Sequence, residues 1–471
     1  MAIAIAILAA GKGTRLKSRR PKVLHSIGGK PLLLHVIDAA LGIVPATDIY
    51  VIVGHEAEKV RAAVAHTGVR FAEQGEQKGT GHAVQQALAS LHSYEHVLVL
   101  SGDVPLLKSS TVAALRDFHI SEQAAMTILS AEVENPFGYG RVIRQSPDSP
   151  ESTNPVQRIV EQKSLAPDEE PHREINSGIY AFALEPLAAH IGALEANNSQ
   201  GELYLTDMAG LLAKAGERVL AMRVPSAVEV LGANTIAEMM ALDTALRQAT
   251  AERHMVAGIT IFQPHTVVID AEVEIGPDTV LEPFVQLLGA TTVGAGSTVR
   301  SYSVLENMRV GDRVLIRQGC ILADSEIRDG ALIGPYAHVR PESLVEEGAH
   351  IGNFVELKKT HMGKGAKANH LAYLGDTEIG AEANIGAGTI VCNFDGVAKH
   401  RTRIGEGAFI GSDSVLVAPL TVGAGAYVAA ASCVTEDVPD NALALGRARQ
   451  VNKEGWATTR RARASRRGKR Q

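Results

Sequence analysis

An aliphatic residue recurs at every sixth position through most of the second half of the chain. The clean runs are Ile275, Leu281, Leu287, Val293, Val299 and Leu305, then Ile327, Ile333, Val339, Val345, Ile351 and Leu357, then Ile404, Ile410, Leu416, Val422, Val428 and Val434. A period of six fits neither a helix nor an isolated alternating strand, but it fits short strands separated by turns. The array therefore predicts a parallel β-helix of hexapeptide repeats, with these side chains inside.

Glycine often follows the aliphatic position of a repeat. The glycines in this position are Gly276, Gly294, Gly311, Gly334, Gly352, Gly380, Gly386, Gly405, Gly411 and Gly423. Glycine tolerates backbone conformations that other residues avoid. We therefore expect these glycines to lie where the backbone bends between strands.

The six-residue phase is interrupted in two ways. It slips by five residues at 305–310 and at 322–327, which predicts shortened corners. We interpret the 22-residue interval 357–379 as four residues longer than three repeats, and the 13-residue interval 391–404 as one residue longer than two. Extra residues in a solenoid loop out of one face, where function is often located. The first interval contains His370, so we expect that loop to carry chemistry.

The first half of the chain alternates short apolar runs with helix-like segments. This order is typical of an α/β, Rossmann-like domain with a mainly parallel sheet. The expected strands are residues 4–8, 49–53, 96–100, 125–131, 142–144 and 178–182. The predicted division is a nucleotide-binding domain at 1–230, a linker helix at 231–255, a β-helix at 256–450 and a basic tail at 451–471.

The basic tail contrasts with the net charge of -6 for the whole chain. Its cationic residues are Arg460, Arg461, Arg463, Arg466, Arg467, Lys469 and Arg470. We expect the tail to be disordered, because runs of like charge repel. Aromatic residues are not interleaved with the charges, so we expect no nucleic-acid partner.

Cysteine usage and hydropathy bear on the compartment. The three cysteines have no CxxC spacing, which favours neither a disulfide framework nor a zinc site and suggests a reducing cytoplasm. The apolar stretch at residues 2–10 lacks a basic segment before it, so we interpret it as a buried strand rather than a signal peptide. No later stretch is long enough for an integral membrane segment.

The first predicted strand ends in a glycine-rich turn, LAAGKGTR at residues 8–15, followed by Pro21 and Lys22. Glycines let backbone N–H groups approach phosphate oxygens, and Arg15 and Lys22 supply positive charge. Taken alone, the turn is equally consistent with an ordinary tight turn, because it matches neither the P-loop nor the dinucleotide motif. Asp103, just past the strand at 96–100, is well placed to hold Mg²⁺ between phosphates.

Several motifs together resemble known families. LAAGKGTR with its trailing Pro-Lys, GTGHA at residues 79–83 and Gly102-Asp103 resemble the sugar-nucleotidyltransferases. Downstream, NHLAYLGD at residues 369–376 matches the HLxYLGD pattern of an acetyltransferase. From about residue 3 to residue 456 the chain resembles the bacterial family of bifunctional N-acetylglucosamine-1-phosphate uridylyltransferases and glucosamine-1-phosphate N-acetyltransferases. This resemblance implies a left-handed β-helix, synthesis of UDP-N-acetylglucosamine as a cell-wall precursor, and a homotrimer.

The resemblance implies roles for residues of the first half, in transfer of a uridylyl group from UTP to N-acetylglucosamine-1-phosphate. Asp103 and Asn234 would hold Mg²⁺, and Arg15 and Lys22 would contact phosphates during catalysis. The substrate-binding residues would include Leu8, Gly11, Lys22, Gln74, Gly79, Thr80, Gly140, Glu161, Asn176 and Asn234. Of these, Gln74, Gly79 and Thr80 match uracil-binding positions, while Gly140, Glu161 and Asn176 match those that hold the sugar. Ser101 replaces a tyrosine found in some relatives.

Roles in the second half follow in the same way, for acetyl transfer from acetyl-CoA to glucosamine-1-phosphate. His370 matches the general base, and Arg340, Lys358, Tyr373 and Asn384 match the residues that bind the sugar phosphate. Lining the cofactor would be Ala387, Asn393, Phe394, Ser412, Ala430 and Arg447. Phe394 departs from the family's usual tyrosine, which puts a role for a hydroxyl there in doubt. A histidine titrates near neutral pH and can accept the proton of the attacking amine.

Two other functions are compatible with parts of the sequence. The β-helix could be an inert oligomerisation module on a nucleotidyltransferase, but His370, Lys358, Arg340, Tyr373 and Asn384 would then have no reason to occur together. Alternatively, the chain could be a scaffold with a degenerate nucleotide fold, which would predict loss of Asp103 or Lys22. Both residues are present.

Overall fold

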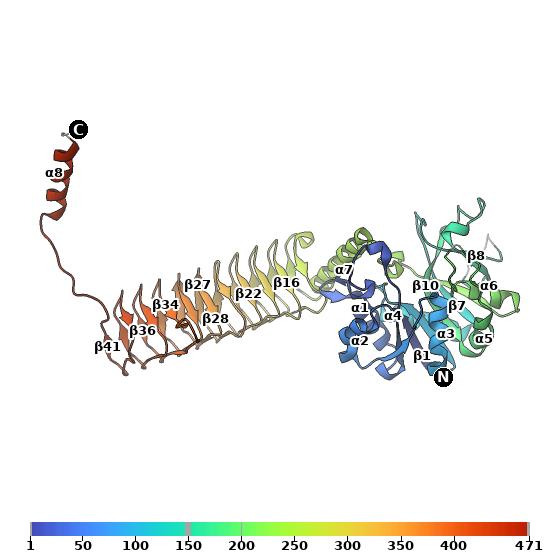
Figure 1. Cartoon of the computed structure of the whole chain (residues 1–471), viewed down its shortest axis with the longest axis horizontal. Helices are drawn as coiled ribbons and strands as arrows, with labels where there is room; N and C mark the ends of the chain where they lie inside the picture. The colour runs from blue at the N-terminus through green and yellow to red at the C-terminus, as the bar shows by residue number, and fades with distance from the viewer. Residues whose placement is uncertain (1, 147–151, 199, 469–471) are drawn as a thin grey trace. The chain divides into compact units, whose positions relative to one another are not determined.

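The computed structural model describes residues 2–146, 152–198 and 200–468 (Figure 1). The chain divides into two compact units, residues 1–250 and 251–471. Each unit has its own hydrophobic core, and each is described here by itself.

A mixed sheet forms the centre of the first unit, with the order β11-β7-β10-β6-β1-β4-β5. Its strands, with the β8–β9 pair attached to β10, are β1 (Ile3–Leu8), β4 (Ile49–Val53), β5 (Arg70–Glu73), β6 (His96–Ser101), β7 (Met126–Glu132), β8 (Arg141–Arg144), β9 (Val156–Val160), β10 (Glu174–Ala183) and β11 (Val219–Arg223). β1 runs parallel to β4 and β6, while β10 is antiparallel to β6 and β7. All six expected strands are present, and β5, β9 and β11 were missed.

Helices cover both faces of this sheet. They are α1 (Leu32–Leu41), α2 (Ala57–Val64), α3 (Thr80–Leu91), α4 (Ser109–Ser121), α5 (Leu184–His190) and α6 (Asp207–Lys214), and a small hairpin joins β2 (Ser26–Ile27) to β3 (Lys30–Pro31). α1, α2 and α4 contribute to the core on one face, and α3, α5 and α6 to the core on the other. Because both faces are covered, central strands such as β1 are apolar along nearly their whole length.

The expected linker helix begins later than predicted. α7 spans Ile236–Val256, whereas residues 227–230 form a short 3-10 helix and residues 231–235 form a loop. The Ala233 amide donates to the Asp103 carbonyl oxygen at 3.1 Å, which ties this loop to the end of β6. The helical prediction for 231–235 was therefore wrong, because tertiary contacts override the local pattern. The division between the two units falls within α7, between residues 250 and 251.

The second unit is a left-handed parallel β-helix with three sheets, seen as a regular stack in Figure 1. The first sheet contains β12 (Thr260–Ile261), β15 (Val280–Leu281), β18 (Thr298–Val299), β21 (Leu315–Ile316), β24 (Leu332–Ile333), β27 (His350–Asn353), β30 (Lys367–His370), β33 (Asn384–Ile385), β36 (Phe409–Ile410), β39 (Tyr427–Val428) and β41 (Leu443–Ala444). The second contains β13 (Val268–Ile269), β16 (Gln286–Leu288), β19 (Val304–Glu306), β22 (Ile321–Ala323), β25 (His338–Val339), β28 (Glu356–Lys358), β31 (Tyr373–Gly375), β34 (Ile390–Cys392), β37 (Val415–Val417) and β40 (Cys433–Val434). The third contains β14 (Glu274–Ile275), β17 (Thr292–Val293), β20 (Arg309–Val310), β23 (Glu326–Ile327), β26 (Leu344–Val345), β29 (His361–Met362), β32 (Thr377–Ile379), β35 (Thr402–Ile404) and β38 (Leu420–Val422).

The aliphatic residues of the repeats fill the interior of the coil, as expected. Leu281, Leu287, Val299 and Leu305 are completely buried. The slips of five residues also have the expected consequence, since Val293 pairs with Val310, one residue sooner than the full three-repeat spacing that joins Leu281 to Val299. The shortened corners are therefore confirmed.

The interpretation of the interval 357–379 was wrong. Met362, Ala368 and Leu374 are buried between Leu357 and Ile379, so the interval holds regular rungs and no loop. His370 lies at the end of strand β30. The pattern was misread because methionine and alanine occupy two inward positions that an aliphatic count overlooks.

The large insertion lies instead at residues 393–401, between β34 and β35. Glu378 pairs with Arg403, 25 residues later, whereas the preceding coil pairs His361 with Glu378, 17 residues later. The interval 391–404 therefore carries a loop of several residues rather than one. Phe394 and Lys399 form an antiparallel bridge inside this loop.

The role expected for the repeat glycines was also wrong at most positions. Of the ten, Gly334 has a positive φ, of 88°. At Gly352 a Cβ atom would lie 1.8 Å from the Asn369 carbonyl oxygen, and at Gly411 it would lie 2.4 Å from the Ala430 amide nitrogen. Glycine is needed at these sites because the next coil approaches closely, not because the chain bends there.

The described part of the basic tail is not disordered. α8 spans Trp456–Gly468, and Arg460 stacks on the Trp456 ring with its guanidinium carbon 5.5 Å from the ring centre. Alanine and arginine are strong helix formers, which accounts for the helix despite its charge. The remaining residues of the tail, 469–471, lie outside the described residues. Within the described ranges, no helix is both long enough and apolar enough to cross a membrane.

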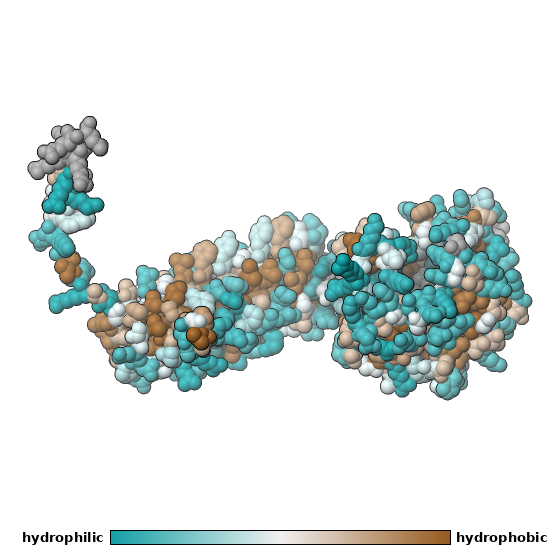
Figure 2. Space-filling view, in the orientation of Figure 1, coloured by the Kyte–Doolittle hydropathy of each residue, from teal (hydrophilic) through white to brown (hydrophobic). Residues whose placement is uncertain are grey.

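Apolar side chains are exposed at several places on the β-helix, as the brown areas over this unit in Figure 2 illustrate. Two pairs of exposed aromatic rings stack across neighbouring coils. The ring centres are 5.1 Å apart for Phe284 and Tyr302 and 5.6 Å apart for Tyr336 and Phe354. Leu371, one coil beyond Phe354, is also exposed. These residues form an exposed apolar ridge.

Candidate active sites

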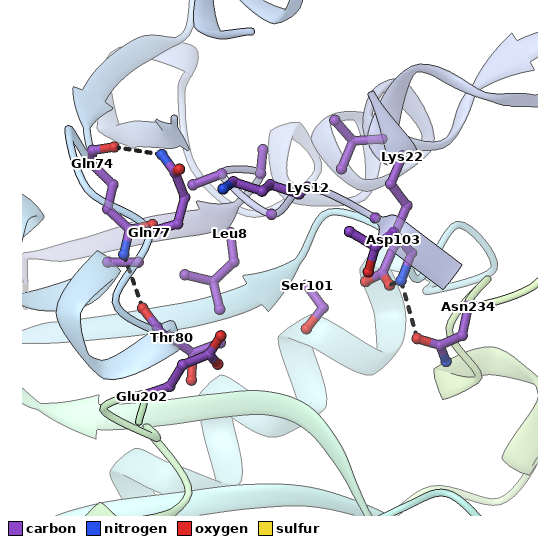
Figure 3. A pocket seen from close by; sticks show the side chains of 18 of the residues that line it. Leu8, Lys12, Lys22, Gln74, Gln77, Thr80, Ser101, Asp103, Glu202 and Asn234 are labelled. Atoms are coloured by element: carbon purple, nitrogen blue, oxygen red, sulfur yellow. Dashed lines mark hydrogen bonds and ion pairs between the residues drawn. The ribbon is translucent and has the colours of Figure 1, made fainter. Parts of the chain in front are cut away.

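A cavity of about 590 Å³ opens at the carboxyl ends of β1 and β6 in the first unit (Figure 3). Its lining includes nine of the residues expected to act in uridylyl transfer: Leu8, Gly11, Arg15, Lys22, Gln74, Gly79, Thr80, Asp103 and Asn234. Gln77, Gln200 and Glu202 also line it and were not singled out from the sequence. Gln200 and Glu202 come from an irregular segment that carries no motif, so the sequence held no signal for them.

Two cations and two oxygen-bearing side chains meet at one end of this cavity. The Lys22 ammonium forms an ion pair with the Asp103 carboxylate and donates to Asn234 Oδ1 at 3.1 Å. Arg15 Nη2 donates to the same oxygen at 2.9 Å. Figure 3 shows Lys22, Asp103 and Asn234 pointing toward one another. A cation thus already bridges the Asp103 and Asn234 oxygens.

The glycine-rich turn determines where Lys22 can lie. Gly13 has φ of 60°, and a Cβ atom there would lie 2.6 Å from the Cβ of Lys22. Both the backbone conformation and the close approach require glycine at this position. The turn therefore brings the Lys22 side chain against the end of β1.

The opposite end of the cavity is built around Gln74, a side chain that is 3% exposed. Gln74 Nε2 donates to the Gly79 carbonyl oxygen at 2.9 Å and lies 3.0 Å from His82 Nδ1. Thr80 Oγ1 accepts from the Leu205 amide at 3.0 Å. Gln74, Gly79 and Thr80, which were expected to bind one base, therefore lie together.

A second cavity, of about 260 Å³, shares Leu8, Thr80, Ser101, Gln200 and Glu202 with the first. Glu161 and Asn176 line it, together with Tyr180, Tyr204 and Thr206. The Asn176 amide nitrogen donates to the Gly140 carbonyl oxygen at 2.9 Å, which brings Gly140 to the same place. Ser101 donates to the Gly178 carbonyl oxygen at 3.0 Å and lines both cavities.

Burial changes the acid–base behaviour of this second cavity. Desolvation raises the pKa of the Glu161 carboxyl, and the Thr206 hydroxyl, which donates to Glu161 Oε1 at 3.3 Å, only partly offsets this. Asn176 Nδ2 donates to the Tyr180 hydroxyl at 2.9 Å. The cavity therefore offers neutral hydrogen-bonding groups beside a carboxyl that resists ionisation.

The second candidate site lies on the outside of the β-helix, along β25, β28 and β31. Arg340 Nη1 donates to Glu356 Oε1 at 2.9 Å, and Lys358 Nζ lies 3.2 Å from Asp376 Oδ2. Tyr373 follows on the next strand, since Glu356 pairs with Tyr373. The structure therefore brings Arg340, Lys358 and Tyr373 onto one face.

The insertion at 393–401 adds polar groups to this face. The Asn393 amide donates to the Asp376 carboxylate that also holds Lys358. Lys399 forms a hydrogen bond with Lys358, which raises the pKa of Lys358 and lowers the pKa of Lys399. Two amines and Asp376 therefore surround one spot. Lys399 was missed because the size of this insertion was misjudged.

His370 begins a straight column of residues at the corner of the coil. The register of β30, β33, β36 and β39 stacks Ala387, Ser412 and Ala430 in turn beyond His370. Backbone hydrogen bonds hold this column, since Asp413 donates to the Ala387 carbonyl oxygen and Ala431 to the Ser412 carbonyl oxygen, each at 2.7 Å. Three residues expected to line the cofactor are therefore aligned with His370.

Three expected residues lie elsewhere within the single chain. Asn384 pairs at the level of Lys367, three residues before His370, which corresponds to roughly 10 Å along a strand. Phe394 is exposed in the insertion, and Arg447 is exposed beyond β41. One copy of the chain does not assemble these three residues against His370.

Comparison with known proteins supports the division of labour between the two units. Residues 5–166 match the MobA-like NTP transferase domain. Bifunctional protein GlmU from Koribacter versatilis is 56% identical over 459 residues, covering 98% of this chain and 97% of that protein. Bifunctional protein GlmU from Solibacter usitatus is 52% identical over 462 residues, covering 98% and 97%. The same-named protein from Streptococcus agalactiae serotype V is 44% identical over 452 residues, covering 96% of each.

A nucleotidyltransferase domain continued by a hexapeptide-repeat β-helix defines a class of transferase with two separate sites. Similarity over nearly the full length goes further than the class. The chain belongs to the bifunctional GlmU family. It is a bifunctional enzyme of UDP-N-acetylglucosamine synthesis, with uridylyltransferase and acetyltransferase activities.

Proposed function

We propose that the paired cavities of the first unit carry out uridylyl transfer and that the outer face of the β-helix around His370 carries out acetyl transfer. The observation that carries the first assignment is the Lys22 ammonium bridging Asp103 and Asn234. It supports a site that gathers cations, two oxygen ligands and a glycine-rich turn, as binding of a nucleoside triphosphate requires.

Asp103 and Asn234 fit Mg²⁺. Their carboxylate and amide oxygens are ligands that this ion prefers, and the bridging Lys22 ammonium occupies the same space between them. In the described ranges there is no group of three histidine, cysteine or acidic side chains that could hold a metal. Two protein ligands suit Mg²⁺, which usually completes its coordination with water and substrate phosphates. When bound, the ion would neutralise charge on the phosphates.

The chain's own residues would align two anions. UTP would lie with its base against Gln74, Gly79 and Thr80, and N-acetylglucosamine-1-phosphate would lie against Gly140, Glu161 and Asn176. A phosphate oxygen of the sugar phosphate would attack the α-phosphorus of UTP, and the bond to pyrophosphate would break. Arg15 and Lys22 would hold the phosphates through charge-assisted hydrogen bonds, while Leu8 and Gly11 contribute to the wall of the nucleotide site.

In the acetyl site the amine of glucosamine-1-phosphate would attack the thioester carbon of acetyl-CoA. His370 would accept the amine proton, the carbon–sulfur bond would break, and the CoA sulfur would leave. Backbone N–H groups beside Ala387 are available to stabilise the oxyanion. The column Ala387, Ser412 and Ala430 offers small residues along which the cofactor could lie.

Arg340, Lys358 and Lys399 would hold the phosphate of the amino sugar. Lys358 and Lys399 contact each other, and Asp376 and Glu356 already orient Lys358 and Arg340. Two like charges kept together are favoured when an anion joins them. Lys399 therefore extends the set of residues expected from the sequence.

We further propose that the protein assembles as a homotrimer. Asn384 and Arg447 lie away from His370 in one chain, so a second copy could supply them. The exposed apolar ridge of Phe284, Tyr302, Tyr336, Phe354 and Leu371 supports self-association. The three unpaired cysteines agree with a reducing, cytoplasmic compartment.

A paired assay tests both assignments on one preparation. Pyrophosphate release is measured with UTP, Mg²⁺ and N-acetylglucosamine-1-phosphate, and thiol release with acetyl-CoA and glucosamine-1-phosphate. Asp103→Ala should reduce the first by about a thousandfold, because the metal stabilises several kcal/mol of developing charge. His370→Ala should reduce the second about a hundredfold or more, as expected for loss of a general base.

Each variant serves as the other's control, since the unaffected reaction reports that the chain is folded. If Asp103→Ala lost both activities, the separation of the sites would be wrong. If the unmodified protein released pyrophosphate but no thiol, the β-helix would be an oligomerisation module.

A further inference from the structure

Asn353 occupies the coil directly before His370, in the same column. The two residues pair in the register between β27 and β30, and the Leu371 amide donates to the Asn353 carbonyl oxygen at 3.0 Å. Asn353 Oδ1 lies 2.6 Å from His370 Nδ1. No role for Asn353 follows from the motifs around His370, because it lies 17 residues earlier in an ordinary repeat.

The backbone holds this pair closely. At Gly352, just before Asn353, a Cβ atom would lie 1.8 Å from the Asn369 carbonyl oxygen, just before His370. The residues that follow, Phe354 and Leu371, both have positive φ, of 55° and 50°, so the two coils turn in the same way. The close approach at Gly352 brings the Asn353 side chain within hydrogen-bond distance of the imidazole.

An amide oxygen can only accept a hydrogen bond, so His370 Nδ1 must be the donor. In the neutral imidazole the lone pair then resides on Nε2, the nitrogen that Asn353 does not touch. We propose that Asn353 is a positioning residue that holds His370 in the tautomer and orientation required of the base in acetyl transfer. This inference rests on the proposed role of His370.

The neutrality of Asn353 matters as much as its geometry. A carboxylate at this position would stabilise the imidazolium and keep the base protonated to higher pH. The charged and titratable groups near His370 are positive or titrate as cations: burial first, and then Arg317, His370 and Lys367, lower the pKa of His350 on β27. Asn353 therefore orients the ring without favouring its charged form.

Three variants test the proposal in the full-length protein. Asn353→Ala should lower kcat for acetyl transfer by about tenfold to a hundredfold, the usual cost of removing a group that orients a reactive histidine. KM for both substrates should change little, because Asn353 would not touch them. Asn353→Asp should move the acid limb of the pH–rate profile upward by about one pH unit, because the carboxylate favours the imidazolium.

The matched control is Asn369→Ala, on the same strand as His370. The Asn369 amide oxygen has no hydrogen-bond partner, so its removal should leave both kcat and the pH profile near those of the unmodified protein. Uridylyl transfer, measured in every sample, reports folding. Wild-type kcat in Asn353→Ala, or an unmoved acid limb in Asn353→Asp, would overturn the proposal.

His370→Gln separates this inference from the function on which it rests. If His370→Gln retained acetyl transfer, the base itself would be wrongly assigned. If His370→Gln were inactive while both Asn353 variants matched the unmodified protein in rate and pH profile, only the positioning role would be wrong.

Discussion

The two units assemble their candidate sites by opposite routes. In the first unit, Arg15 and Lys22 meet Asn234 across 219 and 212 residues of sequence, because the ends of strands and a loop before α7 converge on one cavity. In the β-helix, Asn353, His370 and Ala387 meet because they are spaced by one coil each. A loop-built site depends on a few long-range contacts, whereas a coil-built site depends on regular spacing.

The difference teaches where each site is vulnerable. A side chain in the loop-built site can be removed while the sheet beneath it stays intact. In the coil, each backbone approaches the next closely, so a single added methyl group can displace a whole rung. The following predictions test this contrast, from the largest expected effect to the smallest.

Lys22→Ala should lower uridylyl transfer by about a hundredfold to a thousandfold, because a charge that stabilises the transition state is removed. It should also tighten binding of Mn²⁺ to the nucleotide-free protein by about tenfold, since the ammonium no longer pairs with Asp103. Electron paramagnetic resonance titration with Mn²⁺ measures the second effect. Lys12→Ala, in the same cavity, should leave metal binding unchanged.

Unchanged Mn²⁺ affinity in Lys22→Ala would mean that the cation bridge between Asp103 and Asn234 does not limit access of the metal. Thermal unfolding should change little, which is the signature expected of a loop-built site.

Gly352→Ala should destabilise the β-helix by about 3 kcal/mol, at the upper end of the usual cost of overpacking, because the added Cβ would meet the Asn369 carbonyl oxygen. Acetyl transfer should fall with it, while uridylyl transfer persists. The control is Gly348→Asn in the same coil, where φ is 65° and the added Cβ meets nothing within 4 Å. Denaturant unfolding of both variants measures the difference, and equal stability would contradict the close-packing argument.

Lys399→Met should raise KM for glucosamine-1-phosphate about tenfold, a typical cost of losing one charge-assisted hydrogen bond. Contact with Lys358 lowers the pKa of Lys399, so Lys399 loses its charge as pH rises sooner than an isolated lysine. In the unmodified protein KM should therefore rise on the alkaline side, and Lys399→Met should remove that rise. Lys364→Met, outside this contact, should keep it.

Glu161→Gln should stabilise the first unit by about 1 kcal/mol at neutral pH, raising its unfolding temperature by roughly 2–4 °C. Burial raises the pKa of Glu161 above its ordinary value of 4.5, so the folded state pays for ionisation that the unfolded chain undergoes freely. The advantage of glutamine should be absent below pH 4.5, grow as pH rises through the raised pKa, and then stay constant. Calorimetry at several pH values measures it, and a pH-independent difference would contradict the cause.

The sequence predicted the elements whose pattern is repeated or whose motif is local. The aliphatic hexads gave the coil and its shortened corners, and LAAGKGTR with Gly102-Asp103 predicted residues that do meet in one cavity. The 393–401 insertion was underestimated because Met362 and Ala368 fill inward positions without matching the aliphatic pattern. Lys399 and Asn353 could not be singled out, because their contacts depend on which coil lies beside which.

The insertion at 393–401 also has a consequence for how the acetyl site can vary. Strands β32 and β35 pair over three successive residues across it, from Thr377 with Thr402 to Ile379 with Ile404, so the coil resumes in register despite the extra length. Lengthening a loop costs little free energy, growing only with the logarithm of its length. The segment that carries Asn393 and Lys399 can therefore be shortened, extended or exchanged as an independent cassette, giving the scaffold a place to acquire new acceptor preferences without refolding.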